Sequence, residues 1–273
     1  MPIWLIPAFL GTALLYASVG FGGGSTYNAL LALAGVDYRV LPAIALTCNI
    51  IVVIGGTWRF HRAGLLPWRR ALPLVLVSAP FAGLGGLTPI TETAFLALLA
   101  TSLFVAGLAL LVQRERPLET APAQQDRKTG FADLLTGAGV GYLAGLVGIG
   151  GGILLSPVLL MIRWTQQKQT AAISAAFIFV NSAAGLLGFV QQHTPWIIDS
   201  QKTGGVADAE MAGRCAFGDP WFAVVAILSV LILPVLLGGF FGSWYGAKKF
   251  DQTVMKYILC VVLLIAAIKL LLP

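Results

Sequence analysis

Two glycine-rich stretches of five residues, called pentads below, are the strongest candidates for a functional site in this sequence. The run Gly20-Phe21-Gly22-Gly23-Gly24 recurs as Gly148-Ile149-Gly150-Gly151-Gly152. Each pentad follows an apolar segment and precedes a short apolar one. Glycine permits backbone conformations that other residues avoid, and it lets other groups approach the main chain. A helix that begins just after such a break presents unpaired N–H groups and the positive end of its dipole, so each break is a candidate anion site.

Polar side chains follow both pentads and recur on the next long apolar segment of each half. Asn49 lies deep in segment 41–60, and Asn181 lies in the matching segment 170–191, beside Ser182. A deep asparagine is costly to leave unpaired in a membrane, so it faces a cavity or the bundle interior. It can equally form an interhelical hydrogen bond worth about 1 kcal/mol, and the sequence leaves binding and packing open. The predicted substrate-binding residues are Gly22, Gly23, Gly24, Ser25, Thr26, Asn28, Thr47, Asn49, Gly150, Gly151, Gly152, Ile153, Ser156, Ser174 and Asn181.

Two alternatives accompany this interpretation. Small residues also let membrane helices pack closely, but the duplication of the pentad, with a short segment after each copy, favours a site over packing. Arg59 and Arg163 lie at segment ends, where either could attract an anion. The commoner explanation for such arginines is that they reach the membrane interface.

The composition is that of an all-α polytopic membrane protein. Of 273 residues, 58% are hydrophobic and 10% are charged, whereas a soluble domain carries about 25% charged residues. No basic residue precedes the first apolar segment, so we expect a retained span and not a cleaved signal peptide. The apolar segments that we expect to be helices are 3–20, 24–34, 41–60, 71–90, 94–112, 131–148, 152–162, 170–191, 220–247 and 253–272.

The repeat divides the chain into two transmembrane halves. Residues 1–112 form the first repeat, 113–130 a cytoplasmic linker, and 131–273 the second repeat. The second repeat carries a polar extramembrane insertion at 192–219, which we expect to be a loop. The short segments after the pentads cannot cross a bilayer upright at about 1.5 Å per residue. Each is therefore part of a Gly-broken helix or of a re-entrant hairpin, and the sequence does not choose between them. In either case the chain leaves each half on the side of the membrane opposite to the side on which that half began. The second half therefore starts on the other side from the first, which predicts two inverted-topology repeats.

The distribution of basic residues agrees with inversion. The formal charge is +6, from 17 Lys and Arg. Inversion leaves four of these on one side, and the positive-inside rule then predicts a cytoplasmic position for the other 13 and an outside position for both termini. If the two halves had the same orientation in the membrane, the basic residues would be distributed less unequally between its two sides. The four outside residues are Arg39, Lys202, Arg214 and Lys269.

Several function classes lack their motifs. Cys48, Cys215 and Cys260 are isolated, and no metal-binding spacing is present. No Asp or Glu lies in the middle of an apolar segment, which argues against proton coupling through a carboxylate. Phosphate-loop and hydrolase motifs are also missing. We therefore expect no enzyme, cofactor, metal or nucleic-acid partner.

The sequence resembles the TauE/SafE family of membrane proteins over essentially its whole length. The resemblance rests on Val19–Gly24, on Val147–Pro157, on Thr47-Cys48-Asn49 with the following Arg59–Trp68, and on Phe177–Phe189. It implies transport of sulfite, sulfonates or related sulfur-containing anions in the bacterial inner membrane.

The resulting hypothesis is a secondary transporter, acting as an exporter of an anion such as sulfite or sulfoacetate. It would work by alternating access around a midplane site between the two pentads. An anion channel of the same architecture, or a carrier of a different small organic anion, is the alternative. The expected partners are the small anion and membrane lipid, and a homo-oligomer is left open.

Overall fold

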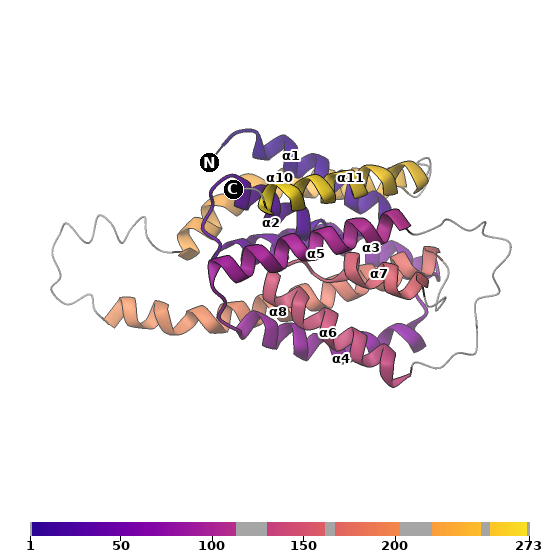
Figure 1. Cartoon of the computed structure of the whole chain (residues 1–273), viewed down its shortest axis with the longest axis horizontal. Coiled ribbons are helices and arrows are strands. Elements are labelled where there is room, and N and C mark those ends of the chain that lie inside the picture. Colours follow the sequence, from indigo (N-terminus) through magenta and orange to yellow (C-terminus); the bar gives the residue numbers. More distant parts are fainter. Residues whose placement is uncertain (1, 113–129, 162–166, 203–219, 247–251, 272–273) are drawn as a thin grey trace.

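The protein is a bundle of α-helices, seen here in a computed structural model (Figure 1). The structure describes residues 2–112, 130–161, 167–202, 220–246 and 252–271. All regular secondary structure within these ranges is α-helical. The helices are α1 (Leu5–Val19), α2 (Gly24–Leu33), α3 (Leu41–Arg62), α4 (Trp68–Leu87), α5 (Glu92–Val112), α6 (Phe131–Val147), α7 (Gly152–Met161), α8 (Gln167–Lys202), α10 (Pro220–Gly246) and α11 (Gln252–Leu271).

Each predicted apolar segment is one of these helices, and with one exception the ends agree within about three residues. The exception is α8. The sequence predicts a loop from residue 192 onward, and this is wrong for residues 192–202, which belong to the helix. The helix continues to Lys202 and extends beyond the bundle in Figure 1. Polarity alone does not end a helix, and the first glycine pair after Gln192 is Gly204-Gly205. The remainder of the expected insertion, 203–219, lies outside the described residues.

The bundle exposes large apolar side chains on its surface and buries a few polar ones in an otherwise apolar core. Large apolar side chains of α10 are exposed, with Leu233 at 63% and Phe240 at 61%, whereas Asn49 and Asn181 are completely buried. A protein surrounded by water shows the opposite preference, so this surface suits lipid. Among the described residues, five helices are long and apolar enough to cross a membrane: α3, α4, α5, and the central parts of α8 and α10. Helices α1 and α6, and the segment Tyr257–Leu271 of α11, are apolar but shorter.

Helices α1 and α6 end in the same way, at the first glycine of each pentad. Gly20 and Gly148 adopt left-handed conformations, with φ of 87° and 75°. The next residue of each pentad then donates its N–H to a carbonyl five residues back, Phe21 to Tyr16 and Ile149 to Ala144. This is the hydrogen-bond pattern of a Schellman motif, which requires a residue tolerant of positive φ. The repeat seen in the sequence thus has a counterpart in the backbone.

The two short helices turn back toward the bundle end from which the chain came. Gly20, at the end of α1, lies beside Phe60 in the last turns of α3, and α2 then ends near the start of α5, where Ala32 and Glu92 line one cavity. Gly148, at the end of α6, lies instead beside Pro42 in the first turn of α3. The first glycine of one pentad thus lies near the last turns of α3, and the first glycine of the other lies near its first turn. Figure 1 places the two chain termini at one end of the bundle.

The packing of helices has the same pattern in both halves. Helix α1 packs on α10 and α6 on α4, while α3 packs on α10 and α8 on α4. Helices α3 and α8 meet each other, as do α5 and α11. Exchanging each helix for its counterpart in the other half leaves these pairings unchanged. Glycines bring the backbones close together: a Cβ on Gly145 of α6 would collide with the main chain of Ala82, and one on Gly242 of α10 with that of Leu14.

Candidate functional site

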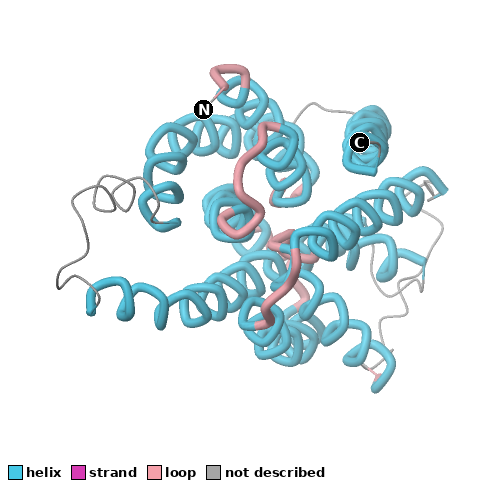
Figure 2. Tube along the Cα trace, turned by 60° about the vertical axis from the view of Figure 1, so that its left-hand side comes forward, coloured by secondary structure: helices cyan, strands magenta, loops and turns pink. Residues whose placement is uncertain are grey.

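Asn49 lies between the two glycine pentads. If Gly22 carried a Cβ, it would lie 2.5 Å from the Asn49 Oδ1 atom, and a Cβ on Gly24 would collide with the Asn49 Nδ2 atom. A Cβ on Gly150 of the second pentad would lie 2.8 Å from the same nitrogen. Only glycine at these three positions leaves room for the amide. One side chain of α3 therefore contacts both halves of the repeat in the interior of the bundle, where Figure 2 shows non-helical segments between the helices.

The Asn49 amide has no hydrogen-bond partner, although the residue is 0% exposed. Both its Oδ1 and Nδ2 atoms are unpaired. The Ser182 hydroxyl on α8 is also buried and unpaired, and it lies 3.0 Å from the Cβ position of Gly150. An unpaired polar group of this kind costs about 1–3 kcal/mol when buried. The cluster thus offers hydrogen-bond donors and acceptors that the protein itself does not use.

Ile178 fills the space beside the amide. It would contact a Cβ at Gly22, at Gly150 and at Gly152. Neither Ile178 nor Ser182 is in the predicted set of binding residues. Their spacing from Ser174, four and eight residues, places all three on one face of a helix, and that signal could have found them. In this conformation Asn49 and Ile178 occupy the region between the pentads.

The predicted polar residues of the first half have partners elsewhere. The hydroxyls of Ser25 and Thr26 both bond to the Tyr16 hydroxyl on α1, at 3.4 Å for Ser25. Asn28 donates from Nδ2 to the Val147 carbonyl at 2.7 Å, which ties α2 to the end of α6. The Thr47 hydroxyl donates to the Ala43 carbonyl of its own helix at 2.7 Å. These contacts hold the hairpins in place and do not extend to Asn49.

In the second half the predicted hydroxyls and amide also form pairs. The Ser156 and Ser174 hydroxyls lie 2.6 Å apart and join α7 to α8. Asn181 accepts a hydrogen bond from the Ser78 hydroxyl of α4 at 2.8 Å, and its Nδ2 atom remains unpaired. Ile153 is a buried apolar residue of the core. Asn49 and Asn181, although predicted as equivalents, therefore have different surroundings.

Two of the predicted glycines face away from the amide. Gly23 and Gly151 both have positive φ, of 85° and 77°. A Cβ on Gly23 would meet the ring of Tyr27 and the side chain of Thr12, and one on Gly151 would meet the ring of Phe177. These two glycines are required by backbone conformation and packing. The members of the predicted set that gather around Asn49 are Gly22, Gly24 and Gly150.

The partial charges around this cluster come from the backbone. Helices α2 and α7 begin at Gly24 and Gly152, next to the cluster, and a helix start carries about half a positive charge. Arg59 is held elsewhere, because its guanidinium donates to the Ser243 hydroxyl at 2.9 Å and lies 5.7 Å from the Phe240 ring centre. This position agrees with the interfacial explanation. Arg163 lies outside the described residues.

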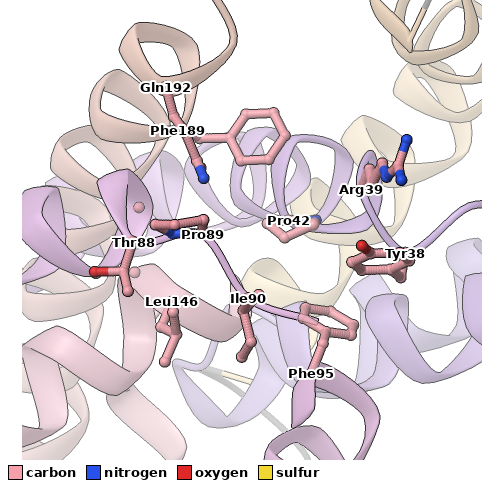
Figure 3. A pocket seen from close by; sticks show the side chains of 13 residues that line it. Tyr38, Arg39, Pro42, Thr88, Pro89, Ile90, Phe95, Leu146, Phe189 and Gln192 are labelled. Carbon is pink, nitrogen blue, oxygen red and sulfur yellow. The ribbon is translucent and has the colours of Figure 1, made fainter. Parts of the chain in front are cut away.

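A cavity of about 210 Å³ approaches the second pentad from the end of the bundle at which α3 begins (Figure 3). Its wall includes Pro42, Leu146 and Phe189, and Pro42 also packs against Gly148. Arg39 lies at the rim, exposed and beside Tyr38, and the Gln192 amide extends toward the centre. The Tyr38 side chain, followed by nearby carboxylates, raises the pKa of Arg39 above its usual range, so the guanidinium stays charged.

An apolar outer surface and helices of spanning length define an integral membrane protein. Comparison with known sequences identifies the family. The model of the family described as Sulfite exporter TauE/SafE matches residues 5–270. The chain belongs to this TauE/SafE family of membrane transporters.

Two relatives have names of the same kind. A probable membrane transporter protein of Sinorhizobium fredii is 30% identical over 269 residues, which cover 98% of each chain. A probable membrane transporter protein of Methanocaldococcus jannaschii is 26% identical over 203 residues, covering 71% of this chain and 74% of the relative. No solved structure matches the chain. The family and these relatives are transporters and not enzymes.

Proposed function

We propose that the protein is a secondary transporter that exports a small sulfur-containing anion, such as sulfite, sulfoacetate or a related organosulfonate, across the bacterial inner membrane. The anion would bind between the two pentads, at Asn49, the starts of α2 and α7, and the Ser182 hydroxyl. The sulfur-containing substrate rests on the family description. The negative charge of the proposed substrate is argued from the geometry of the site.

The unpaired amide of Asn49 is the observation that carries this proposal. A packing asparagine in a membrane bundle finds a partner on a neighbouring helix, as Asn28 does with the Val147 carbonyl. Asn49 has none, yet three glycines make room for it. A bound oxyanion would accept hydrogen bonds from its Nδ2 atom and from the Ser182 hydroxyl. The buried polar groups would then be paired in the loaded state.

The arrangement of hairpins supports alternating access. We propose that the two halves are inverted repeats, since the first glycines of their pentads lie near opposite ends of α3 and their helix pairings are interchangeable. Inverted repeats of this kind place the substrate near the bilayer midplane and open the two sides in turn. The cavity behind Pro42 would be the access route on the outer side. Movement of Asn49 and Ile178 would open the space that they fill.

The membrane potential favours export. With the cytoplasm negative by 100 mV, the exit of one negative charge gains about 2.3 kcal/mol. An outward carrier of a monoanion therefore needs no coupling ion. The orientation that puts Arg59, Arg62, Arg69 and Arg70 in the cytoplasm follows from the positive-inside rule.

Substitution of Asn49 by Asp tests the site. The new carboxylate has the shape of the amide and would bring a negative charge to the position proposed for the substrate. We expect reconstituted protein to lose efflux of radiolabelled sulfite and sulfoacetate by 100-fold or more, on the order of the several kcal/mol that a buried unpaired charge costs. Thr47→Val, on the same helix, removes a hydroxyl bonded only within α3, and we expect it to keep efflux. Efflux by Asn49→Asp at the rate of Thr47→Val would rule out the proposed site.

The channel alternative makes a different prediction for the same preparation. A carrier shows saturable flux and counterflow, in which unlabelled anion on one side drives uptake of labelled anion from the other. A channel shows ohmic single-channel currents in planar bilayers. We take a carrier as the first hypothesis, because Asn49 and Ile178 both lie against the glycines of the pentads.

A further inference from the structure

We propose that the site takes its substrate as a singly charged anion, so that sulfite would cross as hydrogensulfite and sulfoacetate with its carboxyl group protonated. This inference rests on the proposed function and specifies the ionic form in which that function operates. It follows from the charge that the described residues of the site can balance, and from the hydrogen-bonding groups that they leave free.

The positive charge available at the site is small. Each of the helix starts at Gly24 and Gly152 contributes about +0.5, so together they balance about one negative charge. The ends of α1 and α6 lie close by and reduce this total, although their Schellman hydrogen bonds occupy some of their carbonyl groups. No Lys or Arg is among the described residues whose atoms lie around Asn49 and the pentads. The cost of bringing an ion out of water rises steeply with its charge, so a dianion would be left largely unbalanced here.

The unpaired groups include acceptors as well as donors. The Asn49 amide has both its Oδ1 and Nδ2 atoms free, so exchanging the two atoms in the assignment leaves one acceptor and one donor in either case. The Ser182 oxygen can also accept. The sulfite dianion has no proton to donate, and the Asn49 oxygen would face another charged oxygen. Methanesulfonate also lacks a proton, but it can turn its methyl group toward that acceptor. Hydrogensulfite donates its own proton and satisfies that acceptor.

The titratable protein groups near the site are few. Tyr16 on α1, Tyr27 on α2 and Cys48 on α3 are buried around the first pentad and interact with one another. From α7 and from the part of α8 that faces the pentads, the groups nearest Asn49 are Ile178 and the Ser174 and Ser182 hydroxyls. A pH dependence at pH values too low for tyrosine and cysteine to lose their protons would therefore arise from the substrate.

The experiment compares three anions in proteoliposomes made with the full chain. Sulfite loses its second proton within the working pH range, methanesulfonate is a monoanion throughout, and sulfate is a dianion throughout. Above the pKa of hydrogensulfite, we expect sulfite transport to fall about tenfold for each pH unit, in proportion to the protonated fraction. Methanesulfonate transport should stay constant over the same range, and sulfate transport should be at least about 100-fold slower than methanesulfonate transport.

The variant Tyr27→Phe tests whether the pH dependence of transport arises from the substrate or from a titrating group of the protein. The Tyr27 hydroxyl is unpaired and its ring stacks on Phe9, so phenylalanine preserves the packing. We expect the pH profile of sulfite transport to be unchanged in this variant. A profile that shifts, or wild-type sulfite transport that does not fall as the pH rises, would overturn the inference.

The remaining outcomes distinguish the two proposals. Sulfate transport as fast as that of methanesulfonate would overturn selection of the monoanion while leaving anion export in place. Transport of methanesulfonate together with pH-independent transport of sulfite would do the same. If the protein carries neither sulfite nor methanesulfonate, the proposed function fails, and the inference fails with it.

Discussion

The change in unfolding free energy on replacing Asn49 by Ala distinguishes a binding asparagine from a packing one. The wild-type amide is fully buried with both polar atoms unpaired. Each unpaired group costs about 1–3 kcal/mol, and the substitution removes both. It also leaves a cavity of about 40 Å³, which costs about 1 kcal/mol at about 24 cal/mol per Å³. We therefore expect Asn49→Ala to be more stable than the wild type by about 1 kcal/mol or more, while losing transport.

Asn28→Ala is the matched control. Asn28 is equally buried and its Oδ1 atom is also unpaired, but its Nδ2 atom bonds to the Val147 carbonyl at 2.7 Å. Asn28→Ala removes the unpaired Oδ1 atom but takes away the donor that bonds to the Val147 carbonyl, and these two effects roughly cancel. The cavity then destabilises the protein by about 1 kcal/mol. The two substitutions delete the same atoms from two buried positions, and the structure predicts opposite signs for their effects on stability.

The assay is equilibrium unfolding in detergent micelles, without and then with sulfite or methanesulfonate. A ligand at 100 times its dissociation constant stabilises a binding protein by about 2.7 kcal/mol. Wild type and Asn28→Ala should gain this stability, and Asn49→Ala should gain little. A loss of stability in Asn49→Ala equal to that in Asn28→Ala would refute the argument, because it would show that the amide is paired and holds helices together.

Two further predictions concern the glycines. Gly145→Ala should lower the unfolding free energy by about 1–3 kcal/mol, because its Cβ would collide with the Ala82 carbonyl; Gly139→Ala, with open space around its Cβ, should change it by less than about 0.5 kcal/mol in the same unfolding assay. Gly151→Leu combines a positive φ with a collision against Phe177, so size-exclusion chromatography should show a loss of folded protein as well as of transport. Gly22→Ala has no positive φ to oppose it and should lower transport per folded molecule by displacing the Asn49 amide; unchanged transport would contradict the contact.

The helices of this protein were predictable because their causes are local. An apolar run such as 94–112 forms a helix in a membrane whatever its neighbours are, since its backbone groups must pair within the segment. The ends at Gly20 and Gly148 were equally local, because a left-handed residue that closes a helix is best supplied by glycine. The polar residues from Gln192 onward led to a wrong prediction of a loop, because α8 continues to Lys202.

The site was only partly predictable. Asn49 and Asn181 have matching places in the repeat, and nothing in their local sequence distinguishes them. Packing against α4 gives Asn181 the Ser78 hydroxyl as a partner, while Asn49 meets three glycines and no partner. Which side chains a helix face meets depends on how the helices rotate and how closely they approach, and these depend on contacts between residues far apart in the chain.

The sequence alone therefore determined the apolar helices, the two glycine breaks and the family, because helix formation in lipid and glycine conformation depend on a few consecutive residues. The tertiary structure alone decided which buried polar groups are paired and which are left free for a ligand. That decision needs both halves of the chain, since the Asn49 amide lies against Gly22 and Gly24 from one pentad and Gly150 from the other.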